Sequence, residues 1–188
     1  MRNIFVGMLL TYGVARLVET FRTRDKSQGQ VVVAYTLYLL VADHLAVFLV
    51  VWHEVETLAP RLTATNFIGL IMVVAAAIGR FYSVKTLGVY HSIQIEIRRD
   101  HPVISDGPYF FFSNPYYLSN AVEVVGFPLM VNSFLGAAVA ILLYWPCLYL
   151  RVVLEERALL KAIKAPFAEY MHRVPRFVPT GIRVGASI

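Results

Sequence analysis

Five apolar segments divide the chain, and each is long enough to be considered as a membrane-spanning helix. Each has about 16 to 22 residues, and an α-helix needs about 20 to cross the hydrocarbon core of a bilayer. They cover residues 4–21, 31–52, 66–82, 115–130 and 134–150. The pattern predicts an all-α, multi-pass membrane protein with about five transmembrane helices, organised as a single domain over residues 1–188.

The last two apolar segments are expected to form a helical hairpin. Only residues 131–133 separate them, and so short a connection joins antiparallel helices. Pro146 is expected to kink the second helix of this hairpin, because proline removes a backbone donor. In the third segment, Gly69 and Gly79 permit another helix to approach closely.

The composition supports a membrane location and limits the other classes of protein. Hydrophobic residues make up 58% of the chain and its mean hydropathy is +0.62, whereas soluble domains are about 45–50% apolar. The single cysteine, Cys147, excludes an intramolecular disulfide and lies in an apolar run, where packing explains it. No small-residue cleavage site follows the first apolar segment, so we expect it to be retained as a span.

Lysine and arginine gather beside the ends of the first, third and fifth segments, whereas His53, Glu54 and Glu56 make the loop after the second segment acidic. Basic loops remain on the cytoplasmic side of a membrane. The pattern therefore predicts an external N-terminus, with residues 83–114 and 151–188 in the cytoplasm. These two polar stretches flank the hairpin, so we expect them to meet there and form the functional site. The basic residues thus indicate topology and membrane-lipid contact, with no nucleic acid as partner.

One turn-rich stretch precedes the fourth apolar segment. Residues 106–108, Asp-Gly-Pro, mark a tight turn. Asn114 is expected to cap the following helix, with Pro115 at its first position. Tyr109 and Tyr116 belong to an aromatic cluster beside this helix start. Such a cluster suits either a flat or cationic ligand or an aromatic belt that anchors the protein at the lipid interface.

Charged and aromatic residues continue the fifth segment beyond the membrane. Arg151 and Glu155 are four residues apart and share a helix face, so an intrahelical ion pair is one interpretation of them. A solvated, charged helix end is the alternative. Further along, Phe167 and Tyr170 indicate an amphipathic tail that lies against the membrane interface.

Short motifs follow one another in a defined order over residues 69–180. They are Gly79-Arg80, Leu87-Gly88, His91, Glu96, His101, Gly107-Pro108-Tyr109, Asn114-Pro115-Tyr116, Arg151 with Glu155-Glu156 and Leu159, Phe167, Tyr170 and Val174-Pro175-Arg176. Their order and spacing resemble the isoprenylcysteine carboxyl methyltransferase family of integral membrane enzymes, which use S-adenosylmethionine. Arg16 with Glu19, and His44 with Glu54, are similar to bacterial members that sit beside polyketide-lipid synthases.

The resemblance implies S-adenosylmethionine (SAM) as cofactor, bound at the cytoplasmic face of a membrane that we expect to be the bacterial inner membrane. It implies a lipophilic acceptor from the bilayer, either a prenylcysteine carboxylate or a hydroxyl of a long-chain polyketide lipid. The implied catalytic residues are Arg151, His91 and His101. The implied cofactor-binding residues are Tyr109, Asn114, Pro115, Tyr116, Glu155 and Glu156.

Elementary chemistry agrees with these roles. A carboxylate such as Glu156 can accept hydrogen bonds from a ribose diol or an ammonium group, and aromatic faces attract a sulfonium by about 0.5–2 kcal/mol. The helix N-terminus at Pro115 favours a carboxylate. No Gly-x-Gly-x-x-Gly motif is present, so a Rossmann-type site is not expected. Metal binding by His91, Glu96 and His101 is not expected either.

One departure from the family pattern affects the acceptor. The family has Arg-His-Pro where this chain has Ser113-Asn114-Pro115, and asparagine forms hydrogen bonds but carries no charge and does not titrate. Phosphatidylethanolamine N-methyltransferases also have Asn-Pro here, so phospholipid N-methylation is one alternative function. An NADPH-dependent membrane sterol-type reductase and a non-enzymatic membrane scaffold are the others.

Overall fold

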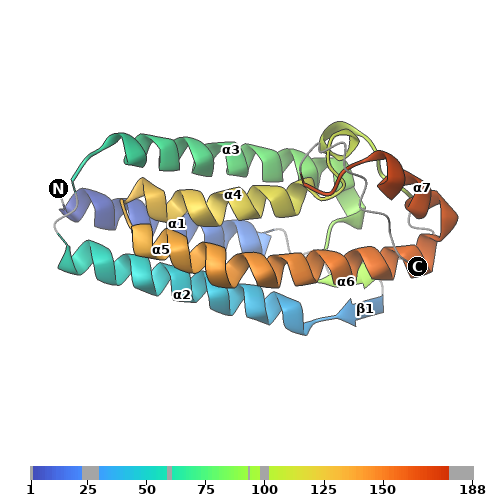
Figure 1. Ribbon diagram of the computed structural model, residues 1–188, viewed down its shortest axis with the longest axis horizontal. Helices are drawn as coiled ribbons and strands as arrows, with labels where there is room; N and C mark the ends of the chain where they lie inside the picture. Colours follow the sequence, from blue (N-terminus) through green and yellow to red (C-terminus); the bar gives the residue numbers. More distant parts are fainter. Residues whose placement is uncertain (1, 23–29, 59–60, 93, 98–101, 178–188) are drawn as a thin grey trace.

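The computed structural model describes residues 2–22, 30–58, 61–92, 94–97 and 102–177. Long helices lie side by side along the longest axis of the molecule (Figure 1). They are α1 (Arg2–Arg22), α2 (Tyr35–Thr57), α3 (Ala64–Leu87), α4 (Pro115–Met130), α5 (Phe134–Val139) and α6 (Trp145–Ile163). The predicted helical membrane fold is confirmed.

Three helical stretches within the described residues are long and apolar enough to cross a membrane. They are Tyr35–Thr57, Ala64–Tyr90 and Phe134–Ile163. Helix α4 has 16 residues and lies beside α3 in the same bundle (Figure 1). The count of five spans therefore stays a prediction.

The second predicted span begins later than its apolar run, because part of that run is a strand. Gln30–Val33 form β1, which pairs antiparallel with β2 (Ile95–Ile97). Consecutive β-branched valines favour extended backbone. This short ladder is the one departure from an all-α fold among the described residues, and it connects the start of α2 to the stretch that follows α3.

The predicted hairpin between α4 and α5 is confirmed. Asn132 has a φ of 59°, the left-handed conformation that asparagine tolerates, and the Ser133 side chain accepts a hydrogen bond from the Gly136 backbone at the start of α5. Helix α5 continues into α6 through a π-helical segment at Ala140–Tyr144. This departure from regular α-helical bonding lies just before Pro146, which cannot donate a backbone hydrogen bond.

Helices α3 and α4 approach each other closely because glycines lie between them. A Cβ atom on Gly69 would lie 2.1 Å from the backbone nitrogen of Met130, and one on Gly126 would lie 3.2 Å from the Gly69 carbonyl oxygen. A Cβ on Gly79 would lie 2.5 Å from the Ser119 hydroxyl. The prediction of a close helix contact at Gly69 and Gly79 is therefore confirmed.

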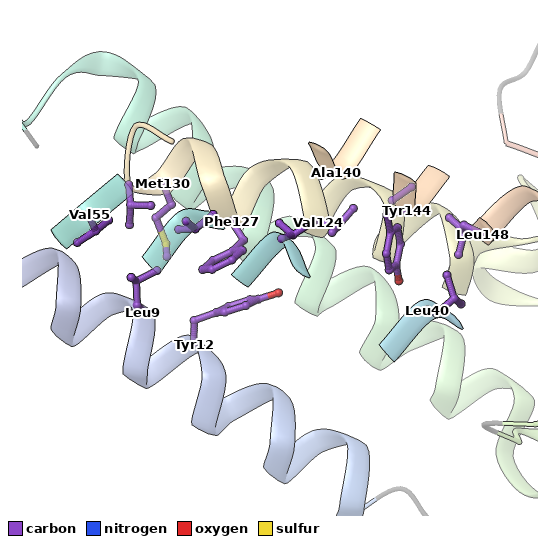
Figure 2. Close-up of a cluster of buried hydrophobic side chains, with 14 of the residues drawn as sticks. Leu9, Tyr12, Leu40, Val55, Val124, Phe127, Met130, Ala140, Tyr144 and Leu148 are labelled. Carbon is purple, nitrogen blue, oxygen red and sulfur yellow. The ribbon is translucent and has the colours of Figure 1, made fainter. Parts of the chain in front are cut away.

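The apolar core lies between α1, α2, α4 and the α5–α6 stretch (Figure 2). Tyr12 of α1 stacks on Phe127 of α4 with ring centroids 4.1 Å apart. The Tyr12 hydroxyl also forms a hydrogen bond of 3.0 Å with His44 Nε2, which gives the mid-helix histidine a polar partner. This hydrogen bond supports a structural role for His44, because a polar side chain surrounded by lipid or apolar groups needs such a partner.

A charge network that is buried at Arg80 and Glu123 and partly exposed at Arg16 and Glu19 joins α1, α3 and α4. The Arg80 guanidinium contacts Glu123 and lies 2.9 Å from Glu19, while Arg16 lies 2.9 Å from Glu19 and 3.5 Å from Glu123. Two arginines and two glutamates neutralise one another, which offsets the cost of removing each charge from water. The network therefore ties α1, which carries two of these four charged side chains, to the α3–α4 pair.

Candidate active site

A pocket lies at the end of the bundle where α3 ends and α4 begins. The pocket is lined by Leu87, Tyr90, His91, Ser92, Gln94, Pro102, Val103, Ile104, Tyr109, Ser113, Asn114, Tyr116, Tyr117, Glu155, Glu156, Leu159, Ile163, Phe167 and Tyr170. The two polar stretches that were predicted to meet therefore meet here.

Local backbone chemistry brings these side chains to the pocket. Gly88 ends α3 with a φ of 53°, and Gly107 begins the short 3-10 helix η2 (Gly107–Phe110) with a φ of 55°. Positive φ is costly for residues with a Cβ, so glycine permits both changes of direction. Pro115 begins α4 with its fixed φ, as predicted, and is buried.

Asn114 has a different role from the one predicted. Its backbone precedes α4, but its side chain forms no capping hydrogen bond. The amide instead donates to Glu156 Oε1 at 2.7 Å and to the Ser113 hydroxyl at 3.0 Å. The prediction of a side-chain cap is wrong, because a carboxylate on α6 lies within reach of a buried amide and forms the stronger, charge-assisted bond.

Glu156 is held by protein donors on both of its oxygens. Besides Asn114, Arg176 Nε donates to Oε1 at 3.0 Å, and a second Arg176 nitrogen donates to Oε2. The hydrogen bond with Glu156 raises the pKa of Arg176 above its usual value. This two-pronged contact connects the segment after α7 (Ala165–Arg173) to α6.

Glu155 accepts a hydrogen bond from Tyr117 on its Oε2 atom, and the described structure gives no hydrogen bond to its other oxygen. Arg151 Nε donates to the same Tyr117 hydroxyl at 2.9 Å. Arg151 is not among the described residues that line the pocket, but Tyr117 and Glu155 are. Arg151 and Glu155, for which an intrahelical ion pair was one interpretation, are thus bridged by the hydroxyl of a tyrosine from α4.

His91 and Tyr116 lie together in the pocket, with ring centroids 5.1 Å apart. Tyr116 is the second residue of α4. His101 and the Glu96 side chain lie outside the described residues, and the expectations for them stay predictions. His91, one of the two histidines implied to be catalytic, lines the pocket.

Helix α7 forms a wall of the pocket, with its apolar side chains Phe167 and Tyr170 buried in the protein. The apolar side chains of the predicted amphipathic tail therefore pack against the protein, and the expectation that the tail lies against the membrane interface stays a prediction. The Tyr170 hydroxyl donates to the Tyr109 carbonyl at 2.7 Å. Burial raises the pKa of both tyrosines above the ordinary range, and Glu155 adds to the effect at Tyr109, so both phenols are neutral donors at pH 7.

The donor set of the pocket suits a ligand with both positive charge and hydroxyl groups. Glu155 offers a carboxylate oxygen, Tyr109 and Tyr116 offer aromatic faces, and the start of α4 offers backbone N–H groups that favour an anionic group. S-adenosylmethionine has a sulfonium, an ammonium, a ribose diol and a carboxylate. The residues present therefore fit such a group.

A family comparison gives a result that agrees with this geometry. The model of the isoprenylcysteine carboxyl methyltransferase family matches residues 68–161, which is half of the chain. The chain belongs to this family. The matched segment contains most of α3, the pocket-lining residues from Leu87 to Leu159, and both glutamates of the pocket.

Two curated proteins are similar along most of the chain. The cobalt-zinc-cadmium resistance protein CzcN of Cupriavidus metallidurans is 27% identical over 89% of this chain and 69% of its own length. The nickel-cobalt-cadmium resistance protein NccN of Alcaligenes xylosoxydans xylosoxydans is 28% identical over 86% of this chain and 68% of its own length. Among the described residues, no group of three or more histidine, cysteine, aspartate or glutamate side chains is placed to hold a metal ion.

A solved structure shares the fold. The eukaryotic intramembrane Ras methyltransferase ICMT superposes with a TM-score of 0.64 and 20% identity, over 79% of this chain. This chain spans about half of that protein, 54% of its length. The two proteins thus share an arrangement of helices.

Three residues of the pocket and of the contacts behind it had no role or partner assigned from the sequence. Tyr117 follows the Asn-Pro-Tyr motif, and its position three residues into α4 was the available signal for it. Arg176 belonged to a recognised motif but had no assigned partner. Thr36 gives no sequence signal, because it lies in the apolar second segment, far from every motif of the site.

Proposed function

We propose that this protein transfers a methyl group from S-adenosylmethionine to a lipophilic acceptor at the cytoplasmic face of the membrane. One observation carries the proposal, namely that one pocket, where α3 ends and α4 begins, combines carboxylates, aromatic faces and a helix N-terminus. Family membership supports the reaction class, and the absence of a Gly-x-Gly-x-x-Gly motif disfavours a dinucleotide fold.

Each part of the pocket has a proposed task. When bound, S-adenosylmethionine supplies an electrophilic methyl group attached to a positively charged sulfur. Glu155 would accept hydrogen bonds from its ribose or ammonium, and Tyr109 and Tyr116 would face the sulfonium. The N-terminus of α4 at Pro115 would attract the carboxylate. Glu156, held by Asn114 and Arg176, would keep the C-terminal segment against the pocket.

Cofactor identity is tested by calorimetric titration of the purified protein. We expect S-adenosylhomocysteine (SAH), the demethylated product, to bind and NADPH to give no binding heat. NADPH binding without S-adenosylhomocysteine binding would support the membrane reductase instead. Binding of neither ligand would leave the scaffold as the better account.

For the acceptor, we propose a hydroxyl on a long-chain lipid in preference to a prenylcysteine carboxylate. Asn114 replaces the titratable histidine of the family pattern, and a neutral pocket residue supports a less charged acceptor. The two acceptors differ in their need for a base. A carboxylate is ionised at pH 7, whereas a phenol with a pKa near about 10 must lose its proton. His91 is the base candidate within the described pocket.

Turnover of a farnesylated cysteine and of a long-chain phenol or enol would identify the acceptor. We expect faster turnover of the phenol or enol, with a rate that depends on pH between 6 and 9 and falls in His91→Ala. Efficient, pH-independent turnover of the farnesylated cysteine, unchanged in His91→Ala, would refute this preference while leaving methyl transfer intact. A phosphatidylethanolamine control would reveal the phospholipid alternative.

A further inference from the structure

A chain of polar contacts runs from α2 to the pocket. Thr36, the second residue of α2, is 1% exposed, and its hydroxyl oxygen accepts a hydrogen bond of 3.0 Å from Arg151 Nη1. Arg151 donates through Nε to the Tyr117 hydroxyl at 2.9 Å, and Tyr117 donates to Glu155. These contacts thus connect a residue outside the family-matched segment to a carboxylate that lines the pocket.

The direction of these hydrogen bonds follows from the donors that each group possesses. A guanidinium only donates, so Arg151 must be the donor to both Thr36 and Tyr117. The phenol has one proton, and because its oxygen already accepts from Arg151, that proton points to Glu155. An arginine held in one place therefore sets the hydroxyl orientation of Tyr117, and Tyr117 in turn sets which oxygen of Glu155 remains available.

Thr36 restrains the Arg151 guanidinium through a different nitrogen from the one that bonds to Tyr117. Arg151 is 3% exposed, and its guanidinium carbon also lies 5.8 Å from the centre of the Tyr117 ring. A buried guanidinium that loses an acceptor will turn toward another one, since an unpaired buried donor costs free energy. That rotation would move Nε away from Tyr117 and release the orientation of Glu155.

We propose that Thr36 is a positioning residue of the cofactor site, acting through Arg151 and Tyr117 on Glu155. The inference rests on the proposed function, because it assigns Glu155 to cofactor binding. It extends the site to α2, so the N-terminal half of the chain contributes to cofactor affinity as well as to the membrane bundle. Thr36 itself is not among the described residues that line the pocket.

Thr36→Val tests the inference, because valine keeps the shape of threonine and removes the acceptor oxygen. We expect the dissociation constant of S-adenosylhomocysteine, measured by calorimetry, to rise about tenfold, equal to about 1.4 kcal/mol. Thr36→Ser restores the hydroxyl and should bind within about twofold of the unaltered protein. Ser83→Ala is the matched control, since Ser83 is also buried and its hydroxyl donates to a backbone carbonyl of α3 at 2.7 Å, apart from these contacts.

A double-mutant cycle separates positioning from general packing. If Thr36 acts through Tyr117, then Thr36→Val should weaken binding by less than about twofold in a protein that already carries Tyr117→Phe. Equal effects in both backgrounds, or a Thr36→Val protein that binds like the unaltered one, would overturn the inference while leaving the proposed function intact. If the unaltered protein binds no S-adenosylhomocysteine, the proposed function and this inference both fail.

Discussion

Replacing Glu156 by glutamine removes a negative charge toward which two residues donate hydrogen bonds. Asn114 donates at 2.7 Å and Arg176 Nε at 3.0 Å, both to Oε1, and a second Arg176 nitrogen donates to Oε2. Glutamine keeps one acceptor oxygen but places an NH₂ group where the second oxygen was. That NH₂ group would face the Arg176 guanidinium, so two donors would be opposed.

The expected cost of Glu156→Gln follows from these contacts. A hydrogen bond to a charged group contributes about 1.5–3 kcal/mol. The Arg176 side chain is 33% exposed and can reach solvent, so we reduce the expected loss of stability to about 1–2 kcal/mol. At about 2–4 °C per kcal/mol for a chain of this size, the melting temperature should fall by about 2–8 °C. The affinity for S-adenosylhomocysteine should change less in Glu156→Gln than in Glu155→Gln.

Glu155→Gln is the matched variant, because it makes the same chemical change one residue earlier. Glutamine still accepts from the Tyr117 hydroxyl, but position 155 of the pocket loses its negative charge. We expect affinity for S-adenosylhomocysteine to fall by about 1.5–3 kcal/mol, roughly 10- to 150-fold, with a smaller change in melting temperature. Calorimetry and thermal unfolding in detergent measure both quantities for each variant.

Opposite behaviour of the two variants would contradict the roles assigned to Glu155 and Glu156. If Glu156→Gln left the melting temperature unchanged and strongly weakened cofactor binding, then Glu156 would bind the cofactor and would not serve to hold Arg176. Unchanged affinity in both variants would remove the carboxylates from the cofactor site altogether.

Three further predictions concern packing, pH and topology. Gly69→Leu should destabilise the protein by several kcal/mol or prevent folding, because its Cβ alone would lie 2.1 Å from backbone of α4, and a normal melting curve would contradict the close packing. Tyr170→Phe should cost about 1 kcal/mol at neutral pH by removing the bond to the Tyr109 carbonyl. Burial raises the folded-state pKa of Tyr170, so the contribution of this tyrosine to stability is complete below pH about 10 and is lost as the pH rises further. The phenylalanine variant should therefore lose stability less steeply at alkaline pH. An unchanged slope of stability against pH would contradict this. Topology can be tested in a protein with Cys147 replaced. A cysteine at position 57 should react with an impermeant thiol reagent added from outside, and a cysteine at position 105 should not. Labelling at position 105 from outside would show that the orientation is the reverse of the predicted one.

Much of the architecture can be predicted from the sequence, because the lipid bilayer restricts which backbone conformations a spanning segment can adopt. Apolar runs of sufficient length predict helices, since every backbone polar group must be paired inside the segment. The hairpin at residues 131–133 and the close contact at Gly69 follow from turn chemistry and from the absence of a side chain. The motifs were also predicted to gather at one end of the bundle, because the basic residues beside them place residues 83–114 and 151–188 on the same side of the membrane.

Only the tertiary structure determined which polar groups are partners. Asn114 was predicted to cap its own helix but donates to Glu156 on α6 instead, and Thr36 bonds to Arg151 across 115 positions of the chain. The ladder between Gln30–Val33 and Ile95–Ile97 was missed for the same reason. Hydrophobic periodicity reports which face of a helix is buried, whereas a buried donor bonds to whichever acceptor the packed helices bring within about 3 Å. That proximity depends on how the helices pack against one another, and no local pattern in the sequence contains it.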